Sequence, residues 1–128
     1  TEFARLIIKA KATKENSDIE EISSPTFSLI QSYYFQCCKI SHIDLYRVNS
    51  ELELFELGIP DIFDNQITIL EWPEVLDTQN LSRYVSIKIK ETKQFKEDRV
   101  IKIEFFGDRW GDLSGALLQS GHFNNEKI

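Results

Sequence analysis

The stretch Lys39-Ile40-Ser41-His42-Ile43-Asp44 decides the fold, because it places an acid directly after a strand-forming run. The run Ile67-Thr68-Ile69-Leu70, followed by Glu71, repeats this arrangement. If both runs are strands of one parallel sheet, Asp44 and Glu71 emerge together at its carboxyl edge, where open α/β sheets hold their ligands. Two acids at such an edge indicate a site for magnesium and phosphate.

The segments around these two runs predict helices and further strands. An amphipathic helix is predicted over residues 1 to about 12, because apolar residues recur at helical spacing at Phe3, Leu6, Ile7 and Ala10. Residues 27–36 and 38–46 are rich in aromatic and β-branched side chains and predict two strands. Residues 66–71 predict a short buried strand. Helix and strands together indicate an α/β protein.

A short helix is predicted after the second strand. The sequence Ser50-Glu51-Leu52-Glu53 matches a capping box, in which a Ser begins a helix and a Glu follows three residues later. We expect Leu52, Phe55 and Ile59 to face inward. Gly58 is placed to end the helix.

Two alternating segments predict a hairpin late in the chain. Apolar and polar residues alternate from Val85 to Lys90 and again from Ile101 to Phe105, as in half-buried strands, and a polar loop separates them. The predicted fold is therefore a mostly parallel central sheet with a C-terminal antiparallel hairpin, flanked by helices.

Size and composition agree with one globular domain. The chain has 128 residues, 41% of them apolar and 28% charged, which is typical of a water-soluble protein with a single core. There is no apolar run of about 18 residues, so no membrane span is expected. The formal net charge of −6 disfavours a protein that grips nucleic-acid phosphates by itself.

The two cysteines, Cys37 and Cys38, are adjacent. Adjacent cysteines rarely form a disulfide, because the ring is strained and neighbours on a strand point to opposite faces. Two thiols alone do not provide the ligands of a structural zinc site. We expect two free thiols in a reducing cytoplasm.

Taken in order, the motifs resemble those of the TsaE family, small P-loop ATPases of bacterial tRNA threonylcarbamoyladenosine biosynthesis. The matching segments are Thr1-Glu2-Phe3-Ala4-Arg5, Ser24-Pro25-Thr26-Phe27, His42 to Arg47, Glu51-Leu52-Glu53, Gly58-Ile59 and Glu71-Trp72-Pro73. The match is collinear from residue 1 to about residue 75. Beyond that point only the pattern of strands is similar.

The resemblance also bears on the start of the sequence. The family pattern opens with a glycine-rich loop ending in Gly-Lys-Thr, and Thr1 corresponds to its Thr. The chain also contains no Met, although about two or three are usual at this size. The resemblance therefore implies a P-loop ATPase domain over residues 1–128 that lacks its N-terminal strand and glycine-rich loop, and we expect the polypeptide to extend upstream.

The resemblance implies a site for ATP and Mg²⁺. In it the Thr1 hydroxyl, Asp44 and Glu71 hold the metal, and Glu71 also orients the attacking water. Thr26 lies in a loop between a helix and a strand, where it would contact the γ-phosphate side and distinguish ATP from ADP. Without the resemblance, Thr1 is most often just a helix cap, Asp44 a cap or a salt-bridge partner, and Glu71 an exposed acid at a strand end, while Thr26 is as readily a turn residue.

Four other residues have both a functional and a purely structural interpretation. The backbone amide of Glu2 and the side chain of Lys96 would approach phosphates or the base, although such lysines are more often solvated. Trp72 is either a core ring or a lid over the nucleotide. His42 taken alone is more often a packed strand residue than a ligand.

By resemblance, the protein is an ATP-hydrolysing subunit for threonylcarbamoyl modification of the adenosine next to the tRNA anticodon. It would act in the cytoplasm with a complex of TsaB and TsaD proteins, away from membranes and without strong direct tRNA binding. Two alternatives stay open. One is a P-loop kinase in which Glu71 or Asp44 activates an acceptor hydroxyl; the other is a non-catalytic adaptor that docks through the late hairpin.

Overall fold

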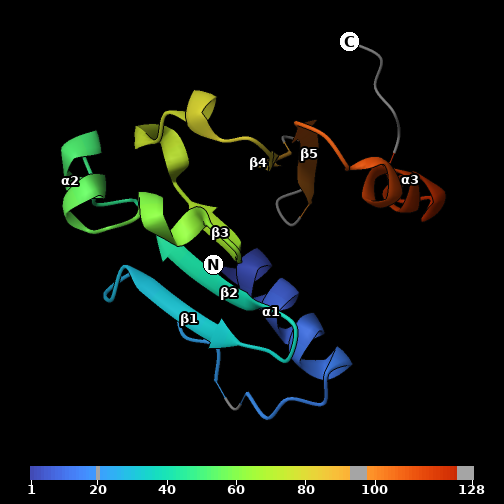
Figure 1. Ribbon diagram of the computed structural model, residues 1–128. Coiled ribbons are helices and arrows are strands. Elements are labelled where there is room, and N and C mark those ends of the chain that lie inside the picture. Colours follow the sequence, from blue (N-terminus) through green and yellow to red (C-terminus); the bar gives the residue numbers. More distant parts are fainter. Residues whose placement is uncertain (20, 93–97, 124–128) are drawn as a thin grey trace. The chain divides into compact units, whose positions relative to one another are not determined.

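A mixed three-stranded sheet organises residues 1–76, the first of two units into which the chain divides (Figure 1). The computed structural model describes residues 1–19, 21–92 and 98–123. In chain order the elements of the first unit are α1 (Glu2–Lys14), β1 (Ile30–Tyr34), β2 (Lys39–Asp44), α2 (Glu51–Glu56), the 3₁₀ turn η1 (Pro60–Phe63), β3 (Ile67–Glu71) and the 3₁₀ turn η2 (Pro73–Val75).

The central strand of this sheet is β2. It pairs with β1 in antiparallel fashion and with β3 in parallel fashion, in register from Ile40 opposite Ile67 to Asp44 opposite Glu71. The predicted parallel pairing of the two acid-ending runs is confirmed, and both acids stand level at the carboxyl edge. The described sheet is mixed rather than mostly parallel, because β1 joins β2 through a tight hairpin turn.

Helix α1 lies along one face of the sheet (Figure 1). Its buried residues Ala4, Ile8 and Ala12 are spaced four apart and therefore form one stripe. The stripe predicted from the apolar residues between Phe3 and Ala10 is wrong, since Leu6 is 64% exposed. Ile8 packs against Ile40 and Tyr33 of the sheet. The two alanines carry small side chains, which leave room for the helix backbone to approach the strands.

The other face of β2 is covered by α2 and the chain that follows it. There Ile43, Leu45, Leu54 and Ile59 form a buried cluster. The predicted capping box is confirmed, since the N–H of residue 53 donates to the Ser50 hydroxyl at 3.3 Å.

The predicted inward face of α2 is correct only in part. Ile59 is buried, but Leu52 and Phe55 are each 68% exposed, and Leu54 takes the inward position instead. A helix of six residues is too short to show a periodic stripe in sequence, so only the tertiary contacts of Leu54 identify its buried side. Gly58 ends the helix as predicted, with a φ of +66°.

The second unit, residues 77–128, contains the predicted antiparallel hairpin. Its elements are the 3₁₀ turn η3 (Thr78–Asn80), β4 (Tyr84–Glu91), β5 (Arg99–Phe106) and α3 (Gly111–Gln119). Tyr84 stacks on Phe106 across the hairpin with ring centroids 4.5 Å apart. Gly107 follows with a φ of +83°, and a Cβ there would lie 2.4 Å from the Ser82 carbonyl oxygen, so only glycine fits.

Within the described ranges, every helix is too short or too polar to cross a lipid bilayer.

Replacing Ile43 with Ala should lower the free energy of unfolding by about 2–5 kcal/mol, because a fully buried side chain is lost from the core of the first unit. The matched control is Ile67→Ala, the same truncation at a residue that is 48% exposed, which should cost about 1 kcal/mol or less. Urea denaturation followed by circular dichroism measures both. Equal losses would contradict the assigned core.

Candidate functional site at the carboxyl edge of the sheet

Glu71, the last residue of β3, lies against the N-terminus of α1. The Thr1 hydroxyl donates to Glu71 Oε2 at 3.1 Å, and the Thr1 backbone nitrogen lies 2.7 Å from the same oxygen. His42 Nε2 lies 2.5 Å from the other oxygen, Oε1. The carboxylate is therefore held at both oxygens, at the positive end of a helix dipole that favours a negative charge.

The surroundings of Glu71 favour its charged form. Burial raises the pKa of this carboxyl group, but in the polypeptide of residues 1–128 hydrogen bonds from the terminal amino group of Thr1, from His42 and from the Thr1 hydroxyl lower it, and the balance leaves the pKa below its usual range. The result is a carboxylate in a partly buried position, as a metal ligand or a water-orienting group requires.

Asp44 stands beside Glu71 on the neighbouring strand and is itself buried. Its Oδ1 accepts a hydrogen bond from the Tyr46 backbone N–H at 3.0 Å, and its Oδ2 accepts one from the Thr26 hydroxyl at 3.2 Å. The Thr26 hydroxyl also lies 2.8 Å from that of Ser24. The loop that carries Thr26 is thus bonded to the carboxyl edge of the sheet.

The structure brings together four of the predicted residues: Thr1, Thr26, Asp44 and Glu71. The signals in the sequence that pointed to this gathering were the two acid-ending runs and the order of the motifs. The roles assigned to the four side chains stay predictions.

Three other predicted site residues, Glu2, Trp72 and Lys96, are not part of this group of hydrogen-bonded side chains. The side chain of Glu2 is 82% exposed and pairs with Arg5 at 2.5 Å, so its prediction rests on the backbone N–H in the first turn of α1. Trp72 is 55% exposed and meets the Tyr46 ring edge-on at 5.4 Å, which excludes the core-ring interpretation. Lys96 lies outside the described residues.

Sequence reasoning missed the contact of His42 with Glu71. His42 is fully buried in β2 and shares a face with Asp44, because side chains two apart on a strand point the same way. Glu71 is the register partner of Asp44. Two signals in the sequence could have identified the contact between His42 and Glu71. His42 stands two residues before Asp44 on one strand, and Asp44 was expected beside Glu71 on the next.

The donor set suits Mg²⁺. Two carboxylates and a hydroxyl offer only oxygen atoms, which this hard cation prefers, and proteins often hold it with one or two carboxylates while phosphate and water complete the shell. Among the residues that the structure describes, His, Cys, Asp and Glu side chains nowhere gather in threes as a metal cage. Thr1, Asp44 and Glu71 therefore fit a metal that is shared with a phosphate ligand.

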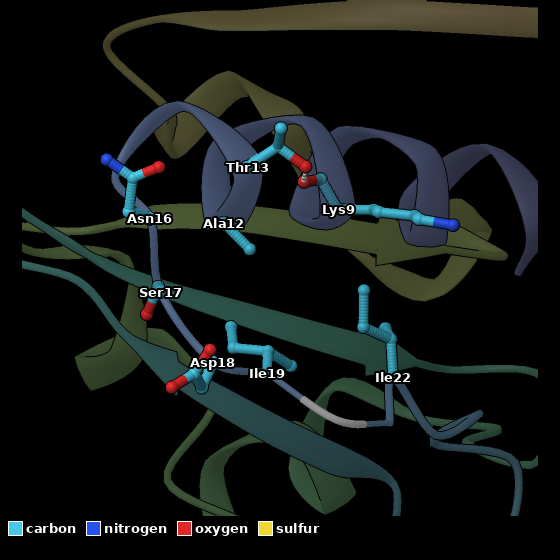
Figure 2. Close-up of a pocket in the computed structure, with 8 residues that line it drawn as sticks. All are labelled: Lys9, Ala12, Thr13, Asn16, Ser17, Asp18, Ile19 and Ile22. Carbon is cyan, nitrogen blue, oxygen red and sulfur yellow. Dashed lines mark hydrogen bonds between the residues drawn. The ribbon is translucent and has the colours of Figure 1, made fainter.

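A separate hollow of about 340 Å³ lies between the C-terminal half of α1 and the loop that follows it (Figure 2). Ala12 faces Ile19 and Ile22 across it, and the Thr13 hydroxyl is turned to the helix backbone, where it donates to the Lys9 carbonyl at 3.0 Å. None of the four gathered residues lines this hollow, so the carboxyl edge of the sheet is the better candidate.

The first unit is a mixed α/β unit in which two strand-ending acids lie beside a helix N-terminus. The family model described as "Threonylcarbamoyl adenosine biosynthesis protein TsaE" matches residues 1–101. The chain belongs to the TsaE family.

Three relatives, each named tRNA threonylcarbamoyladenosine biosynthesis protein TsaE, illustrate the similarity. The Rickettsia bellii protein is 40% identical over 76 residues, which cover 59% of this chain and 50% of that protein. The Rickettsia typhi protein is 32% identical over 106 residues, 83% of this chain and 71% of that protein. The Bacillus subtilis protein is 28% identical over 81% of this chain and 64% of its own length. The chain thus spans about half the length of the first of these relatives.

In the polypeptide of residues 1–128, whose terminal amino group lies against Glu71, replacing Glu71 with Gln should weaken the dependence of stability on acid pH. Because the pKa of Glu71 in the folded protein lies below its ordinary 4.5, its stabilisation is complete above that value and is lost as pH falls through the lower, folded value. The difference in unfolding free energy between pH 7 and about pH 3.5 should therefore shrink in the variant. Urea titrations at both pH values measure it, and the exposed Glu74→Gln is the control that should retain the original difference.

Proposed function

We propose that this protein is a Mg²⁺-dependent ATPase that serves threonylcarbamoyl modification of the adenosine beside the tRNA anticodon. The observation that carries the proposal is the convergence of Thr1, Asp44 and Glu71 where β2 and β3 end and α1 begins. Membership of the TsaE family supports the pathway, and the oxygen-only donor set supports the metal.

The proposal includes a P-loop fold in which residues 1–128 form one domain. In such a fold a glycine-rich loop leads directly into a helix, and its backbone N–H groups and lysine hold the phosphates. Thr1 begins α1 and faces the acids, as the last residue of that loop would.

Each of the four gathered side chains has a proposed role in ATP hydrolysis. A bound Mg²⁺ neutralises charge on the phosphate oxygens of ATP. Thr1, Asp44 and Glu71 would hold the metal through their oxygen atoms. Glu71 keeps lone pairs beyond those used by Thr1 and His42 and would also accept a hydrogen bond from the attacking water. Thr26 donates a hydrogen bond to Asp44 and so connects its loop to the nucleotide site. The position of this loop would therefore differ between bound ATP and bound ADP.

We propose that the protein works in the cytoplasm with a complex of the TsaB and TsaD type, which carries the chemistry on tRNA. A net charge of −6 supports contact with tRNA through such protein partners rather than directly. In this scheme ATP turnover drives a conformational cycle, and Trp72, half exposed beside the site, and Lys96 are the candidates for contacts with the nucleotide.

Replacing Glu71 with Gln in the protein expressed from its full coding sequence should lower the turnover number for ATP by about 10²–10³-fold, because a group that acts on charge at the transition state is lost while the shape is kept. Phosphate release is the measurement. Glu74→Gln, an exposed acid three residues on, is the control and should leave turnover unchanged. Undiminished turnover in the Glu71→Gln variant would favour the adaptor function.

The isolated full-length protein should bind tRNA only weakly at about physiological ionic strength, since counterion release requires clustered basic residues and here 15 are distributed among 21 acids. A filter-binding titration with and without the partner complex measures this. Tight binding by the protein alone would argue instead for direct RNA recognition.

A further inference from the structure

The His42 side chain is fully buried in β2, and only one of its nitrogens has a partner among the described residues. Nε2 lies 2.5 Å from Glu71 Oε1, whereas Nδ1 has no hydrogen-bond partner within the same described ranges. A buried imidazole that served only to fill the core would not require a carboxylate at this distance. An aliphatic side chain would fill the space without an unpaired polar atom.

These contacts define where the imidazole carries its proton. A carboxylate can only accept, so Nε2 must donate to Glu71. A buried N–H without a partner is rarer and more costly than a buried lone pair without one, so Nδ1 is the unprotonated nitrogen. The Nε2–H tautomer therefore satisfies the geometry, and the donor is aimed at one oxygen of Glu71.

Two donors from different elements thus fix the plane of the Glu71 carboxylate. His42 holds Oε1 from the neighbouring strand, and Thr1 holds Oε2 from the start of α1. His42 is fully buried and cannot swing away, whereas Thr1 lies at the surface end of a helix and is 27% exposed. If Thr1 turns toward a metal or a phosphate, His42 is the donor that keeps Glu71 in place.

We propose that His42 is a positioning residue for Glu71: it donates from Nε2 to Oε1 and holds the carboxylate at the orientation in which Glu71 acts on the attacking water. This proposal rests on the ATPase function proposed above. His42 is fully buried behind Glu71 and is not among the residues proposed to hold nucleotide or metal, so its loss should lower the rate of the chemical step and leave nucleotide binding nearly intact. Outer-shell donors of this kind typically change activity about 10–100-fold.

The test compares His42→Leu with His42→Gln in the protein expressed from its full coding sequence. His42→Leu fills the volume without a donor and should lower the turnover number about 10–100-fold, with the KM for ATP changed less than about threefold. His42→Gln places an amide N–H near the position of Nε2 and should recover most of the loss. Ser41→Ala, a buried neighbour on the opposite face of the same strand, is the control and should retain full turnover.

A double-mutant cycle decides whether His42 acts through Glu71. In the Glu71→Gln background, adding His42→Leu should have almost no further effect on turnover, because the group that His42 positions is already lost. Additive losses would overturn the positioning role. The same holds if His42→Leu folds and turns ATP over like the unmodified protein, or if His42→Gln recovers nothing.

A spectroscopic measurement is independent of turnover. A long-range ¹H–¹⁵N spectrum should show one imidazole with a protonated Nε2 and an unprotonated Nδ1, which disappears in His42→Leu and shifts in Glu71→Gln. The opposite tautomer would overturn the inference even in an active ATPase. An unmodified full-length protein that shows this tautomer but does not hydrolyse ATP would instead overturn the proposed function, and the catalytic part of the inference with it.

Discussion

The parallel pairing of β2 with β3 is the constraint on which the rest of the first unit depends. Its register sets Asp44 opposite Glu71, so that two acids separated by 26 residues of chain become neighbours. A slip by one residue would turn Glu71 to the other face of the sheet, away from α1. The apolar contacts on both faces of β2 hold that register, since Ile40 packs under α1 and Ile43 packs against the cluster around α2.

Partly buried carboxylates need donors, and this requirement ties the elements of the first unit together. Asp44 obtains its donors from the Thr26 loop and from the chain that leaves β2. Glu71 obtains its donors from α1 and from β2. Each carboxylate therefore helps to fix the segments that supply its donors, and the site and the local fold are stabilised by the same hydrogen bonds.

The local elements could be read from sequence wherever a short-range rule governs them. The strands β2 and β3, the capping box at Ser50, the stop at Gly58 and the late hairpin each follow from patterns of a few residues, whereas the parallel pairing of β2 with β3 was only a hypothesis. The inward face of α2 could not, because its six residues carry no periodic stripe and long-range contacts select Leu54. The order of the motifs likewise indicated the TsaE family, to which the chain belongs.

The sequence by itself determined which residue types stand at the ends of strands and helices, and hence that Thr1, Asp44 and Glu71 were the candidates for a shared site. Only the tertiary structure decided how these groups are bonded. The partner of His42 depends on a contact across two strands, and that contact exists only once the register is set and α1 closes over the sheet. Composition and periodicity report the burial of a side chain, but the pairing of polar atoms is a matter of distances and angles, which only the folded chain fixes.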